Sequence, residues 1–342
     1  MMSDQRTAPE LTKRVNSVAG IGASLAVLAA ASYAVVNALL RSVAADVDPF
    51  AGSLIRQIPL LLITTTALIV LRPAAVRPKS IEFIGTRMVL VLLVAGSISF
   101  LVGNVLLFSG LNFVGLAVAT AASQGGMVAG GALVSAIALK EPPSKWQVIG
   151  IAIVLIGLIF VASPSFGSVK VNALAAIGFL LSLAAGVCYT ISNAASRTVQ
   201  RKPRTFMTAL ALTNIGGVIA LIVAVGVLNG WRFDLVYQQL TGSQILIILL
   251  AGTVNAVAIA SITLAVRFTT VTVVSAIGSL VIVFGILIAW IVFHEEIAVA
   301  VSVGAAIIIA GVLVTQLKSR AIKKGANLDQ HQSVAETQDA NA

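Results

Sequence analysis

Long uncharged runs alternate along this chain with short segments that hold nearly all of its charged residues. A helix that crosses the hydrocarbon core of a bilayer needs about 20 mostly apolar residues, and its backbone polar groups must be satisfied within the segment. The pattern therefore predicts an all-α integral membrane protein with ten transmembrane helices. The predicted spans are residues 18–40, 51–71, 88–109, 114–139, 146–163, 173–195, 206–228, 244–266, 269–292 and 297–317.

Two of the apolar runs are too long for a single crossing and must turn back. The uncharged stretch from Met88 to Leu139 holds 52 residues, and we expect its turn at residues 111–113. The long stretch after Asp234 divides at Arg267 in the same way.

Composition indicates the same class of protein. Hydrophobic residues make up 58% of the chain and charged residues 10%, with a mean hydropathy of +1.05. An ordinary soluble domain carries about 25% charged residues, so lipid is the expected solvent for this much apolar surface. The single cysteine, Cys188, allows no intramolecular disulfide, and the two histidines, His294 and His331, offer no metal site. We expect no cofactor.

The basic residues predict an orientation in the bilayer. The net charge of +10 does not indicate a nucleic-acid partner, because these residues lie between the apolar runs, and cytoplasmic loops carry an excess of Lys and Arg. With a cytoplasmic N-terminus, 18 of the 22 basic residues lie inside, Arg41, Lys170 and Arg232 lie outside, and Arg56 lies within a span. The expected organisation is a cytoplasmic segment (1–17), a five-helix repeat (18–163), an extracytoplasmic linker (164–172), a second five-helix repeat (173–317) and a cytoplasmic, disordered tail (318–342).

The two halves share an ordered pattern of residues. The matches are Gly22, Tyr33, Asn37 and Arg41 with Gly178, Tyr189, Asn193 and Arg197, at an offset of 156 positions, and Glu141, Gly150 and Gly157 with Glu295, Gly304 and Gly311, at an offset of 154. Each half holds five predicted spans, an odd number, so the halves cross the membrane in opposite senses. Inverted repeats are typical of secondary transporters, whose binding site lies between the halves near the midplane.

The chain resembles the EamA family of the drug/metabolite transporter superfamily. The resemblance rests on five plus five spans, a Glu that closes the fourth and ninth spans, and glycine-spaced fifth and tenth spans. Its best segments are residues 108–160, with Ala138-Leu139-Lys140-Glu141, and residues 267–315, with Phe293-His294-Glu295-Glu296. The chain departs from the family pattern at Gly126 and Leu280, where members often have a proline. The resemblance implies transport of amino acids, other metabolites or toxic compounds, commonly outward, across the bacterial cytoplasmic membrane.

Polar side chains within spans are costly in lipid and are therefore candidates for substrate binding. Arg56 is the main candidate, because its fork of donors can hold a carboxylate or phosphate; the alternative is that it snorkels to the outer interface. Tyr33 and Asn37 share one helix face, as do Tyr189 and Asn193, and hydrogen bonding between helices is the alternative role for them. The further candidates are Gln57, Asn104, Gln124, Asn214 and Asn255.

Two carboxylates and a run of glycines complete the candidate features. Glu141 and Glu295 stand at span ends, where each is a gating residue or a solvated helix end. The spacing from Gly125 to Gly131 is more typical of close helix packing than of substrate contact.

The sequence thus predicts a secondary transporter that moves a small organic metabolite, such as an amino acid or a related zwitterion or anion, by alternating access. Export is favoured by the family resemblance alone. Multidrug efflux or solute uptake by the same fold, a channel, and a permease subunit of a larger complex stay open, as does a homodimer. No Asp or Glu lies in the middle of a predicted span, and no Walker sequence is present, so proton coupling is unsupported and ATP hydrolysis is excluded. We expect no enzymatic activity.

Overall fold

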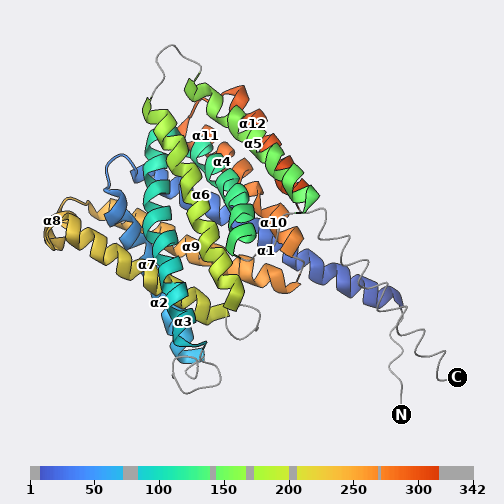
Figure 1. The fold of residues 1–342 in the computed structure, drawn as a ribbon, viewed down its shortest axis with the longest axis horizontal. Coiled ribbons are helices and arrows are strands. Elements are labelled where there is room, and N and C mark those ends of the chain that lie inside the picture. Colours follow the sequence, from blue (N-terminus) through green and yellow to red (C-terminus); the bar gives the residue numbers. More distant parts are fainter. Residues whose placement is uncertain are drawn as a thin grey trace.

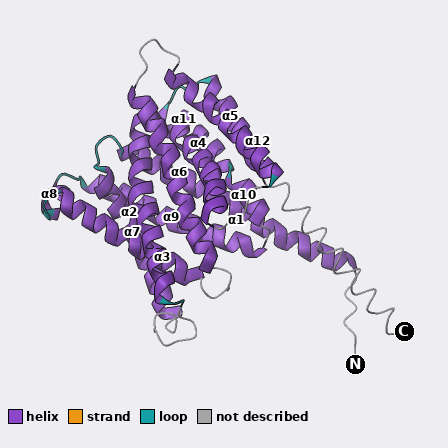
Figure 2. Cartoon of the chain, viewed as in Figure 1, coloured by secondary structure: helices purple, strands orange, loops and turns teal. Residues whose placement is uncertain are grey.

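Helices make up every regular element that the structure describes (Figure 2). The structure is a computed structural model, and it describes residues 8–71, 84–138, 144–166, 173–199, 206–268 and 271–315. The helices are α1 (Ala8–Val43), α2 (Pro49–Leu71), α3 (Thr86–Gly96), the π-helix η2 (Ser97–Gly103), α4 (Asn104–Ala138), α5 (Lys145–Phe166), α6 (Ala173–Val199), α7 (Phe206–Leu228), α8 (Phe233–Gln238), α9 (Gly242–Phe268), α10 (Val271–Gly278), α11 (Leu280–Phe293) and α12 (Val299–Thr315).

Six helical segments of the described residues are long and apolar enough to cross a membrane. They are Gly20–Val43, Pro49–Val70, Thr86–Gly131, Ala173–Ala195, Met207–Leu228 and Gly242–Ala265. Three shorter apolar helices accompany them, Lys145–Val161, Leu280–Phe293 and Val299–Thr315. The prediction of an all-helical membrane protein is confirmed at this level.

The helix boundaries differ from the predicted spans at several points. The turn of the long apolar run lies at Gly115, with φ 75° and ψ −179°, and not at residues 111–113, which are helical. A positive φ is far easier for glycine than for any residue with a Cβ, which explains the location. The predicted span 88–109 is built from α3, η2 and the start of α4, and the predicted span 269–292 is divided at Ser279 between α10 and α11.

The last helices of the two halves, α5 and α12, lie side by side (Figure 1). A Cβ atom at Gly157 would lie 2.8 Å from the carbonyl oxygen of Gly304, and one at Gly150 would lie 2.7 Å from that of Gly311. The start of α5 therefore meets the end of α12, so the two helices are antiparallel. Because the sequence repeat equates Gly150 with Gly304 and Gly157 with Gly311, these contacts exchange when the halves are exchanged.

The first helix of each half packs against the other half. In the structure α1 lies against α9, α10 and α11, while α6 lies against η2 and α4. The second helices, α2 and α7, pack against each other, and each also packs on the third helical segment of the opposite half. The two halves are therefore interlocked around a shared interior rather than laid beside one another as separate bodies.

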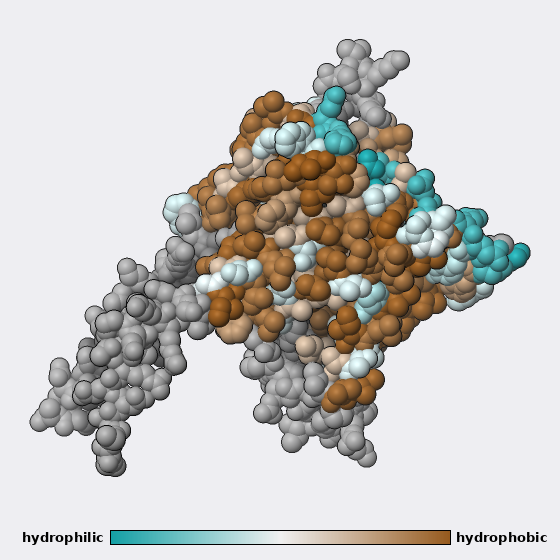
Figure 3. All heavy atoms as spheres, turned by 180° about the vertical axis from the view of Figure 1, so that it is seen from behind, coloured by the Kyte–Doolittle hydropathy of each residue, from teal (hydrophilic) through white to brown (hydrophobic). Residues whose placement is uncertain are grey.

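The surface of the protein is mostly apolar (Figure 3). Side chains such as Val70, Ile137 and Val299 are 67%, 71% and 78% exposed, which suits contact with lipid tails better than contact with water. Hydrophilic residues gather along one edge of the molecule in Figure 3. The exposed polar residues of the α1–α2 turn and of the short helix α8 include Asp46, Asp48, Arg232 and Asp234. Burial raises the pKa of Tyr237 in α8, and the nearby Asp48 raises it further.

Candidate functional site

Arg56 lies inside the helix assembly. It is the eighth residue of α2, about 10 Å along the axis from the start of that helix, and its side chain is 7% exposed. The backbone around it is tightly enclosed, because Gly252 of α9 packs directly against the Arg56 carbonyl group. Burial to this degree disfavours the alternative that Arg56 snorkels to the membrane interface.

Asn104 is the hydrogen-bond partner of Arg56. The guanidinium Nη1 donates to Asn104 Oδ1 at 3.4 Å, and the hydroxyl of Tyr189 donates to the same oxygen at 2.9 Å. The Tyr189 hydroxyl also lies 3.2 Å from the carbonyl oxygen of Gly103. We call Arg56, Asn104 and Tyr189 the arginine cluster; it joins α2, α4 and α6.

The local backbone explains how these side chains meet. Asn104 follows the π-helix η2, whose wider turns often occur at functional sites. Gly103 is the last residue of η2, and a Cβ atom there would lie 3.0 Å from the ring of Tyr189. A glycine at this position therefore leaves room for the tyrosine ring beside Asn104.

The arginine cluster has hydrogen-bonding capacity left over. Arg56 Nε and Asn104 Nδ2 are buried and have no hydrogen-bond partner among the described residues, and both atoms are donors. Arg56 also forms no ion pair with any residue that the structure describes. A buried charge without a partner is unfavourable, so the cluster is suited to a ligand that brings acceptor oxygens and negative charge.

Two buried amides lie on neighbouring helices. Gln57 on α2 and Asn214 on α7 are both 0% exposed, and in the part of the chain that the structure describes neither the oxygen nor the nitrogen of either side chain has a hydrogen-bond partner. An unsatisfied buried polar group costs about 1–3 kcal/mol, so both amides have hydrogen-bonding capacity that a bound solute could use. Asn255 on α9 is also buried, at 3% exposure.

The other predicted binding residues differ in burial and in contacts. Tyr33 is half-buried and within electrostatic range of Arg56. Asn37 donates to the hydroxyl of Thr120 on α4 at 3.4 Å, a contact between helices, and Gln124 is half-buried on α4. Asn193 is exposed on α6, apart from the arginine cluster.

The glycine run in α4 serves helix packing. Gly126 packs directly against the carbonyl group of Leu183 on α6, and a Cβ atom at Gly130 would lie 3.0 Å from Val187 of the same helix. The interpretation of these glycines as close-packing residues agrees with both contacts.

Glu295 is held in specific contacts. Its carboxylate accepts hydrogen bonds from Arg41 and from the backbone of Leu116, so it is not a freely solvated helix end. Glu141, the other predicted gating residue, lies outside the described residues. No direct signal in the sequence marks Arg41, which is predicted only as one of the outer basic residues; its match with Arg197 in the repeat is the available signal.

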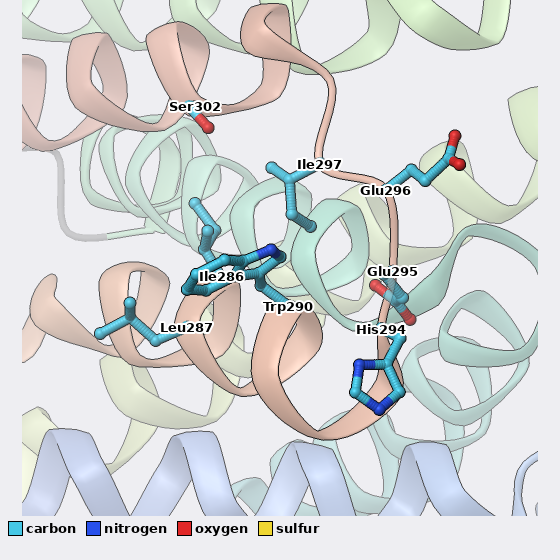
Figure 4. Close-up of a pocket in the computed structure, with 8 residues that line it drawn as sticks. All are labelled: Ile286, Leu287, Trp290, His294, Glu295, Glu296, Ile297 and Ser302. Carbon is cyan, nitrogen blue, oxygen red and sulfur yellow. The ribbon is translucent and has the colours of Figure 1, made fainter.

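Glu295 also borders a surface pocket of about 420 Å³ between α11 and α12 (Figure 4). The pocket is lined by Ile286, Leu287, Trp290, His294, Glu295, Glu296, Ile297 and Ser302. A second pocket, of about 360 Å³, lies at the α1–α2 turn. Neither of these two pockets is lined by the arginine cluster. Within the cluster, Arg56 and Asn104 are buried, at 7% and 1% exposure.

A multi-pass helical assembly with two interlocked repeats and an enclosed cationic cluster defines a membrane protein of the transporter class. The model of the EamA-like transporter family matches the chain twice, over residues 20–163 and 176–317. The chain therefore belongs to the EamA-like transporter family and is a membrane transporter of the drug/metabolite transporter type.

A solved structure supports the fold independently. The structure, titled only "Crystal structure of protein", superimposes with a TM-score of 0.54 at 18% sequence identity, over 90% of this chain and 99% of that chain. At this identity the likeness concerns the fold alone. A comparison with curated proteins gives no match.

Proposed function

We propose that this chain is a secondary transporter for a small organic anion or zwitterion, such as an amino acid or a related metabolite. It works by alternating access of two inverted five-helix halves in the bacterial cytoplasmic membrane, with ten spans, both termini in the cytoplasm, and export as its direction. The observation that carries the proposal is the buried Arg56, which has a free Nε donor and no carboxylate partner among the described residues.

The chemistry of the arginine cluster supports the substrate class. Asn104 Oδ1 is already used by Arg56 and Tyr189, which leaves Arg56 Nε and Asn104 Nδ2 as the unpaired polar atoms. Donors beside a positive charge favour a carboxylate, which accepts hydrogen bonds with both oxygens. A cationic drug would meet an uncompensated positive charge, so multidrug efflux of cations is disfavoured.

Alternating access fits the packing of the two halves. Contacts between α5 and α12 exchange under the repeat, and the first helix of each half packs against the opposite half. A structure built from equivalent halves can exchange their conformations, and the site between them then faces each side in turn.

The experiment compares cells that overproduce the wild type, Arg56→Gln, Arg232→Gln or an empty vector. Metabolites are quantified in the medium and in the cells. We expect a carboxylate-bearing solute to accumulate outside with the wild type and with Arg232→Gln, which removes an exposed arginine, and not with Arg56→Gln. Export of that solute by Arg56→Gln at the wild-type rate would contradict the binding role. If cells with the wild type instead deplete a solute from the medium, the proposed direction of transport changes from export to uptake.

A further inference from the structure

Glu295, in the turn between α11 and α12, joins three parts of the molecule. Its Oε1 accepts a hydrogen bond from Arg41 Nε, near the end of α1, at 3.2 Å. Both carboxylate oxygens also accept the backbone N–H of Leu116, at 3.0 and 3.1 Å, and the N–H of Ala117 lies 3.5 Å from Oε2. One side chain therefore bridges α1 and α4 of the first half to the α11–α12 turn of the second half.

The local backbone is arranged for this contact. Gly115 breaks α4, and the residues that follow begin a new helical segment with free N–H groups and a partial positive charge, which a carboxylate stabilises. His294 ends α11 at φ 50°, and the Glu295 N–H bonds back to the carbonyl of Ala289 at 3.0 Å. A Cβ atom at position 115 would lie 2.6 Å from Glu295 Oε1, so a larger residue there would push the carboxylate out of this position.

We propose that an outer lock holds the extracytoplasmic end of the transport pathway closed. The lock consists of Arg41, Glu295 and the N–H groups of Leu116 and Ala117, and these groups separate when the transporter opens to that side. The inference rests on the proposed alternating access and on the predicted orientation. The elements that the lock joins belong to opposite halves, and these are the elements that must part when the halves rock.

The partial burial of the lock suits a reversible closure. The side chains of Arg41 and Glu295 are 26% and 18% exposed, so the pair is shielded but close to water. The Arg41 guanidinium also lies 6.0 Å from the centroid of the Phe293 ring, which adds a cation–π contact from α11. When the halves part, water can solvate both charges and the free N–H groups, so opening leaves no buried charge behind.

The test measures how fast a buried cysteine is modified, with no substrate present. The background is full-length protein with Cys188→Ser in lipid nanodiscs, and the reporter is Ala119→Cys. Ala119 is 0% exposed and lies in the same core cluster as Leu40 and Leu116, beneath the lock. We expect Glu295→Gln and Arg41→Gln each to raise the rate of labelling by a hydrophilic maleimide about tenfold.

The matched control is Glu296→Gln. Glu296 is exposed, and its carboxylate points away from Glu295 (Figure 4), so its neutralisation should leave the rate unchanged. The exchange Arg41→Glu with Glu295→Arg keeps an opposite-charge pair, but an arginine cannot accept the Leu116 N–H. We therefore expect fast labelling in the exchanged protein as well, and a return to the wild-type rate would show that the ion pair alone closes the pathway and would overturn the lock as defined.

A second reporter separates opening from unfolding. Ala305→Cys lies at 3% exposure in a different core cluster, with residues of α5 and α12. The lock is supported if Glu295→Gln and Arg41→Gln raise the labelling rate of Ala119→Cys and leave the labelling rate of Ala305→Cys unchanged. Wild-type rates in both lock variants, or equal increases at both reporters, would overturn it. Because no substrate is used, this test can fail while the role of Arg56 stands, and the reverse also holds.

Discussion

At the scale of single residues, position in an apolar run was enough to select Arg56, but not to find its partners. An arginine within a predicted span is rare enough to mark a candidate site. Asn104 and Tyr189 were candidates for the same reason, yet their shared hydrogen bonds depend on how α4 and α6 pack, which hydropathy does not contain. Asn193 shows the limit of helix periodicity, because it shares a face with Tyr189 and is nevertheless exposed.

The shared acceptor in the arginine cluster leads to a graded prediction. Asn104→Ala removes the oxygen that orients Arg56 and should raise the substrate KM by roughly 10- to 100-fold, because hydrogen bonds to charged groups contribute about 1.5–3 kcal/mol. Tyr189→Phe removes a neutral hydroxyl and should raise it by roughly 2- to 10-fold. The measurement is initial transport rate against substrate concentration in proteoliposomes, with Tyr237→Phe in α8 as the matched control. A KM for Asn104→Ala equal to that of the wild type would remove Asn104 from the site.

At the scale of helices, the apolar runs predicted where helices lie, but not where they break. The break at Gly115 leaves the N–H of Leu116 without an intrahelical partner, and Glu295, which is 179 residues away, satisfies it. Such long-range compensation leaves no local signal, and the apolar pattern alone predicts the turn at residues 111–113. The π-helix η2 and the division at Ser279 were missed for the same reason, since both lie within continuous apolar sequence.

The close contact of α5 and α12 gives a prediction about stability. In Gly157→Ala the new methyl group would lie 2.8 Å from the Gly304 carbonyl oxygen, so the helices must move apart. We expect the free energy of unfolding to fall by about 1–3 kcal/mol, as in other overpacked interiors. Gly131→Ala is the matched control, because its methyl group would meet nothing closer than 3.7 Å. The midpoint of thermal unfolding in detergent is the measurement, and equal midpoints for the two variants would refute the tight α5–α12 contact.

At the scale of the whole molecule, the repeat in the sequence anticipated the packing of the halves. The repeat equates Gly150 with Gly304 and Gly157 with Gly311, and all four glycines lie at the contact between α5 and α12. Gly157 meets Gly304 and Gly150 meets Gly311, which is the antiparallel arrangement that inverted halves require. Family membership over residues 20–163 and 176–317 follows the same division. The number of membrane crossings and the side of each loop stay predictions, because they depend on the bilayer as well as on the chain.

Single cysteines in the Cys188→Ser background test the orientation. The distribution of basic residues predicts that Trp231→Cys is labelled in whole cells by an impermeant thiol reagent. Arg201→Cys, whose position lies outside the described residues, should be labelled only after the membrane is permeabilised. Labelling of Arg201→Cys in whole cells would contradict the ten-span arrangement.

The central claim is that the protein carries its substrate on a buried arginine without a counter-charge. The most direct measurement is counterflow of the solute found in the metabolite comparison, in proteoliposomes that contain wild type, Arg56→Gln, Arg56→Lys or Arg232→Gln. We predict full exchange for wild type and Arg232→Gln, none for Arg56→Gln, and reduced exchange for Arg56→Lys, which keeps the charge but loses the forked donors. Exchange by Arg56→Gln at the wild-type rate would contradict the account.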